Sequence, residues 1–412
     1  MFTIKQALFI TVSSFYLALL SDSQQLLEKK KVTVDIDKSL TKYLVKFYKH
    51  RLVEGQNNAL APLLDLYALV LLYKVSDASA KTDLHTLLGI PEDAEDGTMD
   101  KFEANIRLYL ERFGGNSVFG TQLFVDSRIK GVTRELQDKK FLTTSTVNFG
   151  QKIEFQQKIN SWMSGLAMSN NHHFVHSFNF DDNTVSLILQ VVAVRWKLPL
   201  ALSTPSKAFL GDQVKYLEGT LEASYAKIDK LGIQVLEPIP SDSDVKLWLI
   251  LPNSMVTFIN KTVGEETLDE IAKSLRNKQQ FVKMSIPQVN IEFNSEENAF
   301  LQNNFHVLSS MFSSPSIRLE LDKEDKHPIK GFLMHCLFQF VEDNSARVPQ
   351  QGTLAVNFDK PFTVMALTKD TNIPLLMASF FSVKDKMLAM EDEEQSLAEQ
   401  VAQEELANRE DL

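Results

Sequence analysis

The sequence predicts one α+β domain, with helical segments early in the chain and strands late. Two observations support this class. Amphipathic helical spacing recurs at residues 39–53 and 100–113, and apolar strand-like runs gather at 331–341, 362–367 and 375–381. With 412 residues, 44% of them apolar and 23% charged, the chain can bury a large core without cross-links.

Four segments have the pattern of helices. Residues 39–53 place Leu40, Tyr43, Leu44, Phe47 and Tyr48 on one face. Residues 60–73 are apolar almost all round, which indicates a helix inside the domain. Residues 100–113 are amphipathic, and 155–163 form another helical stretch.

The strand predictions are based on β-branched or alternating runs. Residues 184–194 and 245–251 are continuous apolar runs, typical of strands covered on both faces. Residues 119–125 have the pattern of a further strand, and 281–293 that of one alternating strand.

The two ends of the chain differ from the body. Residues 1–23 have the pattern of a signal peptide, with Lys5, an apolar stretch of 14 residues and small residues for cleavage. Residues 384–412 form an acidic tail, helical or disordered, in which nine acids between 391 and 412 face Arg409 alone. The last four residues, Arg409 to Leu412, approximate an endoplasmic-reticulum retrieval signal.

Charge and cysteine content limit the partners. The net charge is −10, and the tail accounts for about −8 of it, so the body has no strong field for nucleic acid or an anionic membrane. The lone Cys336 allows no internal disulfide and is interpreted as a small buried residue. Asn260 begins a glycosylation sequon. We expect a secreted monomer without a membrane span.

Catalytic motifs for hydrolases, nucleotide binding and zinc proteases are absent, so we expect neither an enzyme nor a cofactor. The best metal candidates are His172 and His176, which one helical turn would bring together. Without a fixed third ligand they would bind weakly, and an exposed loop is the simpler interpretation.

Several collinear segments resemble the serpin family. Residues 159–162 (INSW) resemble its "INxWV" segment, and 231–238 followed by 249–253 match its "LGAQVLELP…ILPN" run. Residues 282–292 are similar to its "VxxxLPKFKIE" strand, 360–362 to its "HPF" triplet and 375–378 to its closing strand. The resemblance covers roughly residues 39–383, and we place the domain at 24–383.

This resemblance implies a serpin fold with a central mixed sheet of five strands, two smaller sheets and eight or nine helices. In inhibitory serpins a protease cleaves a reactive loop, which then inserts into the central sheet and carries the trapped enzyme along. By the same resemblance Trp196 and His335 lie where the sheet opens. We interpret both as core residues, His335 being buried and hydrogen-bonded.

The hinge of that loop departs from the family pattern. It falls on Ser345, Ala346, Arg347, Val348, Pro349, Gln350, Gln351 and Gly352. Ser345 replaces a glycine, and Pro349 lacks the N–H group that an inserted central strand needs.

The length of the loop is a stronger argument against insertion than the residue types of the hinge. Compactness scaling predicts a body ~55 Å across, which a strand rising ~3.3 Å per residue crosses in roughly 16 residues. We expect Leu354–Asp359 to belong to the next strand, so only about nine residues, Ser345–Thr353, are free.

We therefore predict a non-inhibitory serpin with a binding, carrier or regulatory role and an unknown protein partner. The first alternative is a working suicide inhibitor, for which Arg347 and Lys360 are the basic residues that a trypsin-like protease could select. The second is a chaperone of the endoplasmic reticulum. The collagen-specific serpin chaperone contacts its client through a Leu-x-Tyr-x-Asp pattern, and here Ala355, Asn357 and Asp359 occupy those positions.

Overall fold

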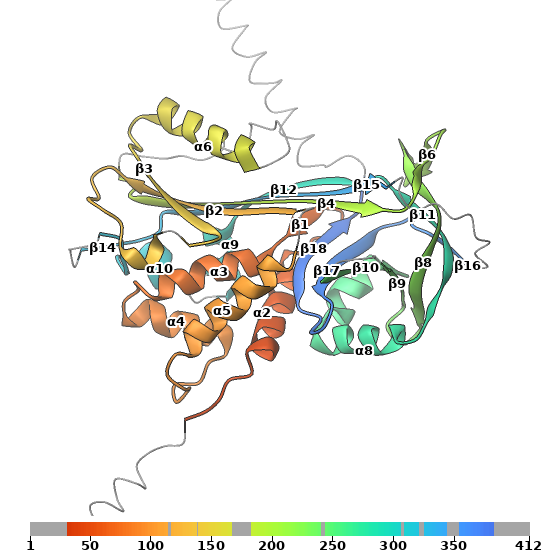
Figure 1. Ribbon diagram of the computed structural model, residues 1–412, viewed down its shortest axis with the longest axis horizontal. Helices are drawn as coiled ribbons and strands as arrows, with labels where there is room; N and C mark the ends of the chain where they lie inside the picture. The colour runs from red at the N-terminus through yellow and green to blue at the C-terminus, as the bar shows by residue number, and fades with distance from the viewer. Residues whose placement is uncertain are drawn as a thin grey trace, which may run out of the picture.

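The computed structural model describes residues 31–113, 117–137, 139–166, 183–239, 244–305, 309–320, 325–343 and 354–382. These residues form the predicted α+β arrangement (Figure 1). A five-stranded sheet has helix α6 on one face and helices α2 to α5 on the other, and a nine-stranded sheet with helix α8 adjoins it.

Nine α-helices occur in the described part of the chain, in agreement with the expected eight or nine. They are α2 (Ile36–Arg51), α3 (Pro62–Tyr73), α4 (Ala78–Leu88), α5 (Thr98–Glu111), α6 (Lys152–Leu166), α7 (Met255–Thr257), α8 (Glu265–Leu275), α9 (Glu297–Phe305) and α10 (Ser309–Ser313). Two short helical segments, η1 (Arg134–Leu136) and η3 (Phe258–Thr262), accompany them.

Local sequence explains where these helices begin and end. Asp35 and Asp77 accept hydrogen bonds from the backbone N–H groups of Lys38 and Ala80, which caps the N-termini of α2 and α4. Gly89 ends α4 in the left-handed conformation, at φ 65°, which costs glycine little. Residues Pro62 to Leu72 of α3 are all buried, as the predicted internal helix requires.

The five-stranded sheet is mixed, as expected. Its order is β12 (Asn290–Glu296), β15 (Gly331–Glu342), β4 (Ser186–Leu198), β2 (Ser117–Asp126) and β3 (Leu142–Val147). The β15–β4 and β2–β3 pairs are parallel, and the β12–β15 and β4–β2 pairs are antiparallel.

The nine-stranded sheet runs β1 (Asn58–Leu60), β18 (Pro374–Phe380), β17 (Phe362–Thr368), β10 (Val245–Pro252), β9 (Ile233–Pro238), β8 (Tyr216–Ile228), β11 (Gln279–Pro287) and β16 (Leu354–Asn357), with β5 (Ala201–Leu202) beside β8. The long strand β8 pairs with β11 along one part and with β9 along the other. This sharing joins the two smaller sheets that the family resemblance implied into one. Two short pairs complete the described strands, β6 (Lys207–Phe209) with β7 (Asp212–Val214) and β13 (Ile317–Arg318) with β14 (Lys326–His327).

One strand prediction was wrong. Residues 281–293 are not a single strand, because β11 ends at Pro287 and β12 begins at Asn290 in the other sheet. The buried positions shift phase at this corner, from Val282, Met284 and Ile286 to Val289 and Ile291. A change of phase turns the side chains to the other face, so the chain cannot continue as one half-buried strand.

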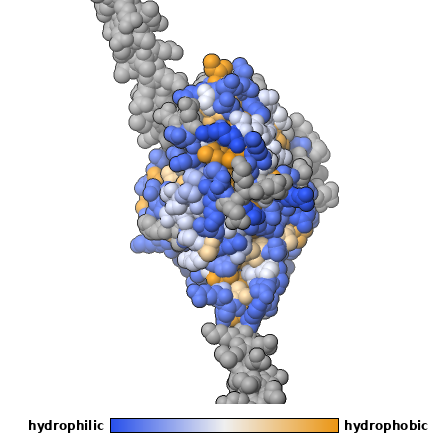
Figure 2. Space-filling view, turned by 90° about the vertical axis from the view of Figure 1, so that its left-hand side faces the viewer, coloured by the Kyte–Doolittle hydropathy of each residue, from blue (hydrophilic) through white to orange (hydrophobic). Residues whose placement is uncertain are grey.

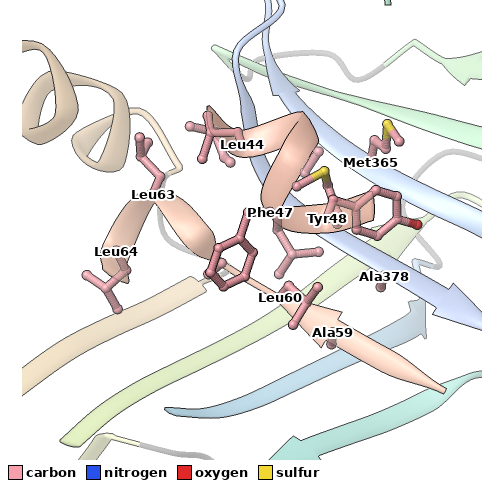
Figure 3. Close-up of a cluster of buried hydrophobic side chains, with 14 of the residues drawn as sticks. Leu44, Phe47, Tyr48, Ala59, Leu60, Leu63, Leu64, Met365 and Ala378 are labelled. Carbon is pink, nitrogen blue, oxygen red and sulfur yellow. The ribbon is translucent and has the colours of Figure 1, made fainter. Parts of the chain in front are cut away.

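The core is continuous from the helices into both sheets. The inner face of α2 places Phe47 near Leu60 of β1, and Tyr48 toward Met365 of β17 and Ala378 of β18 (Figure 3). The Tyr48 hydroxyl lies 2.7 Å from the Ser379 Oγ of β18, so its buried polar atom has a partner. On the face shown in Figure 2 hydrophilic side chains dominate, and apolar ones form small separate patches.

Candidate functional site at the junction of strands β4 and β15

The candidate site is the paired stretch of β4 and β15, which we call the seam. Its register runs from Gly331 opposite Leu187 to Glu342 opposite Leu198, twelve pairs in all. The Asp343 N–H donates to the Leu198 carbonyl at 2.8 Å, which continues the ladder one residue further. The seam is therefore closed along the whole length of β15.

Side chains alternate between the two faces of the seam. Cys336 and Phe338 belong to the main core, on the side of α3, and Gln190 on that side donates to the Leu64 carbonyl of α3 at 2.9 Å. Leu333 and Val191 pack toward α6, on the opposite side.

His335 is buried and hydrogen-bonded, as predicted. Its Nδ1 lies 2.7 Å from the Asn294 Oδ1 and 3.8 Å from the Glu292 Oε1, both on β12. Burial lowers the pKa of His335 to about 4, so the ring is neutral at physiological pH. It faces Val191 in the register and thus lies on the α6 side, across the sheet from Gln190.

Trp196 lies near the end of the seam, opposite Phe340 in the register. It is half-buried and packs against the main core, which agrees with its interpretation as a packing residue. The role of Trp196 and His335 in sheet opening stays a prediction.

A polar row crosses the seam one residue away from Trp196. The Arg195 Nε donates to the Gln339 Oε1 at 3.1 Å, and the Gln339 Nε2 donates to the Asn290 Oδ1 at 2.7 Å. These three side chains join β4, β15 and β12. Sequence reasoning missed the row because it depends on strand register. A signal was present, since Arg195 and Gln339 each interrupt an otherwise apolar run.

Cys336 has no features of a reactive thiol. It is fully buried and free, and burial raises the pKa of its thiol, with the nearby Asp65 carboxyl adding to the effect. Because the thiolate is the nucleophile, such a thiol is inert. The interpretation as a small buried residue is confirmed.

The chain between β15 and β16 spans residues 343–353, which is eleven residues. The predicted hinge residues, Ser345 to Gly352, lie outside the described residues, and so do the signal peptide, the acidic tail, His172 and His176. The expected strand after the loop is confirmed, because β16 begins at Leu354 and pairs with β11 in parallel. The two ends of the segment are thus fixed in different sheets.

The other predicted features lie away from the seam. Asn260 is exposed within η3. In the described residues no group of three or more potential metal ligands occurs. None of the described helices combines the length and apolar character that crossing a bilayer requires.

Comparison with protein families identifies the class. The profile of the serpin (serine protease inhibitor) family matches residues 38–383. The chain therefore belongs to the serpin family. A comparison with curated protein sequences finds no match.

Solved structures agree on the fold. The chain is similar to SRPN18 from Anopheles gambiae (TM-score 0.71, 16% identity, 85% of this chain and 99% of that chain). It is similar to uncleaved ovalbumin (0.71, 14%, 85% and 100%) and to human thyroxine-binding globulin complexed with thyroxine (0.72, 16%, 85% and 98%). At these identities the likeness concerns the fold.

Proposed function

We propose that this serpin does not trap proteases and acts instead by binding a protein partner in the secretory pathway. The observation that carries the proposal is the length of the segment between β15 and β16. Eleven residues, 343–353, must leave one sheet and enter the other, and Asp343 is still paired with Leu198.

Insertion needs more chain than this segment offers. A strand that filled the seam beside all twelve pairs would run ~40 Å at ~3.3 Å per residue. The ten residues 344–353 reach at most ~33 Å, even if cleavage occurred at the last bond and no residue were used for the turn. A protease attached to this segment would stop before the end of the sheet.

A small-molecule carrier role has less support. The thyroxine-binding globulin structure contains a small ligand, but low identity limits that comparison to the fold. Here an apolar cavity between α2, α8 and β10 measures about 10 Å³, which is about the space of one water molecule. A drug-sized ligand would require that lining to open. A larger hollow of about 970 Å³ lies between η3, the start of α8 and the turn after β8, but it is open to solvent and charged side chains such as Lys230, Lys261 and Glu270 line it, unlike a mostly apolar small-molecule site. We therefore favour a protein partner.

Thermal melting before and after cleavage in residues 344–353 tests the proposal. We expect the melting temperature to change by less than ~2 °C, because the segment is too short to fill the seam. An inhibitory serpin treated in the same way is the control. A rise of more than ~5 °C, or an SDS-stable complex with a trypsin-like protease at Arg347 or Lys360, would overturn the proposal and favour the suicide-inhibitor alternative.

The secretory route is supported by the apolar segment near residues 7–20 and by the exposed sequon at Asn260. The sequence contains one such sequon, so expression of the full chain should give a single-glycan shift that Asn260→Gln abolishes. Persistent sensitivity to endoglycosidase H would place the protein in the endoplasmic reticulum, and removal of residues 409–412 should then release it to the medium. An unglycosylated chain would contradict the secretory proposal.

A chaperone role of the collagen-specific type is not favoured. Ala355 and Asn357 are exposed on β16, so small side chains occupy the surface where that chaperone presents larger ones to its client.

A further inference from the structure

The outer face of α2 is uniformly basic. Its exposed residues are Lys38, Lys42, Lys46, Lys49 and His50, and the opposite face is buried. Steps of three and four residues place the lysines along one side of the helix. We call these four lysines the basic face of α2.

The positive charge of this face is not balanced by ion pairs within the part of the chain that the structure describes. None of the four lysines forms an ion pair with a residue that the structure describes. Asp37, the acid in the first turn, accepts a hydrogen bond from the Tyr109 hydroxyl at 2.5 Å. The Nζ of Lys46 lies 4.8 Å from the centroid of the Phe305 ring.

The acidic end of the chain leaves the body close to this helix. Asn57 holds Ser382, because the Asn57 Nδ2 donates to the Ser382 carbonyl at 2.8 Å. Three residues earlier, Ser379 contacts Tyr48 in the last turn of α2. Ser382 is therefore within ~10 Å of chain from a direct contact with α2, next to Lys49.

We propose that the acidic segment 391–412 docks on the basic face of α2 of its own chain. The segment carries nine acids and Arg409 alone, and the helix offers four lysines. Residues 383–390 span up to ~26 Å when extended, and Lys38 to Lys49 cover ~17 Å of helix, so the segment can reach all four. This inference is independent of the behaviour of the reactive segment.

Electrostatics sets the conditions for docking. Each exposed ion pair is weak, so several must form together. The short linker 383–390 gives the acidic segment an effective concentration near α2 in the millimolar range, so weak contacts are sufficient for docking. Salt screens such pairs, with a Debye length of ~10 Å at 0.1 M and ~3 Å at 1 M. Docking should be present at low salt and lost at high salt.

Carbodiimide coupling of the full-length protein, followed by mass spectrometry, gives a direct test. The reagent joins carboxylates to lysine amines in contact, and we expect links from 391–412 to Lys42, Lys46 and Lys49. Lys215 and Lys283 are exposed lysines elsewhere on the body and serve as internal controls. The links should fall at least fivefold in 0.5 M NaCl. Equal labelling of the control lysines, or links found in dimers alone, would overturn the proposal.

A second measurement separates docking from general charge attraction. A fluorescent peptide of residues 391–412 should bind the body truncated after residue 382 at low salt. Lys42→Glu with Lys46→Glu should weaken its binding at least tenfold, and Lys215→Glu with Lys283→Glu less than twofold. Both pairs change the net charge equally. Equal losses, or no binding at all, would show that the lysines form a solvated helix face and nothing more.

Discussion

At the scale of single residues, His335 connects the seam to pH. Its pKa in the folded protein is about 4, below the ordinary 6.5, because burial disfavours the charged ring. Between pH 6.5 and 4 the His335 ring is therefore protonated in the unfolded chain and neutral in the folded chain. The stability contributed by the neutral ring is present above pH 6.5 and is lost as pH falls from about 6.5 toward 4.

We predict that His335→Gln flattens this acid-side loss. The wild type should lose up to about 3 kcal/mol between pH 6.5 and 4 through this group, as the difference between the two pKa values requires. Urea unfolding across that range measures the slope. His327→Gln, at a half-buried position on the short strand β14, is the control. An unchanged slope in His335→Gln would show that other groups cause the acid sensitivity.

At the scale of residues, the sequence predicted burial correctly where a residue's location within an apolar run was sufficient to decide it. A histidine and a cysteine inside a long apolar run had to be buried, whatever the register, and both His335 and Cys336 are. The polar row of Arg195, Gln339 and Asn290 could not be predicted, because its members come from strands far apart in the sequence. Their contact exists only once the register of β4, β15 and β12 is fixed.

At the scale of elements, a buried ion pair joins α2 to α9. The Arg51 Nη2 lies 2.7 Å from the Glu297 Oε1, and the Glu297 side chain is fully buried. The Arg51 guanidinium also lies 3.5 Å from the centroid of the Phe300 ring. Removal of the arginine alone would leave a buried carboxylate without its counter-charge.

We predict that Arg51→Met lowers the free energy of unfolding by ~3–5 kcal/mol, and that adding Glu297→Met recovers most of the loss. Denaturant unfolding of both single variants and the double variant gives the coupling energy. Arg107→Met removes the exposed Arg107–Glu111 pair and should cost less than ~0.5 kcal/mol. Equal losses for Arg51→Met and Arg107→Met would contradict the assignment of a buried pair.

Helix α6 depends on a glycine beneath it. A Cβ atom on Gly120 of β2 would lie 2.6 Å from Leu166 Cδ1 and 3.3 Å from Trp162, both on α6. We predict that Gly120→Ala costs ~1–2 kcal/mol, because the end of α6 must shift away from the sheet. Gly165→Ala, with open space around it, should stabilise the helix by ~0.5–1 kcal/mol. Thermal melting and proteolysis within α6 measure both effects. Unchanged stability in Gly120→Ala would show that the Leu166 side chain moves aside at little cost.

The periodicity of the sequence predicted elements better than it predicted their connections. Helices α2 and α5 appear where the apolar spacing placed them, because one face of each is buried. The corner between β11 and β12 was missed, although the phase of the buried positions changes there. Strand β8 was not predicted, since Gly219 and several charged residues obscure its alternation, and pairing on both sides stabilises it.

At the scale of the whole molecule, two properties of the segment after β15 could prevent insertion, namely its length and its residue types. The two lead to different predictions. Pro349 removes one backbone donor, and the segment is also shorter than the ~40 Å seam. If composition were the obstacle, Pro349→Ala alone would permit insertion after cleavage. If reach is the obstacle, that variant should behave like the wild type.

We predict that length decides. Pro349→Ala should show no rise in melting temperature after cleavage. The same variant with six small residues added before Gly352, cut at the end of the insertion, keeps fourteen residues after Asp343, a reach of ~46 Å, and should gain more than ~5 °C. A strand that fills the seam forms backbone hydrogen bonds with both β4 and β15. A short segment leaves the end of the seam farthest from Asp343 unfilled. A gain in Pro349→Ala alone would show that the proline, and not the eleven-residue connection, keeps this sheet closed.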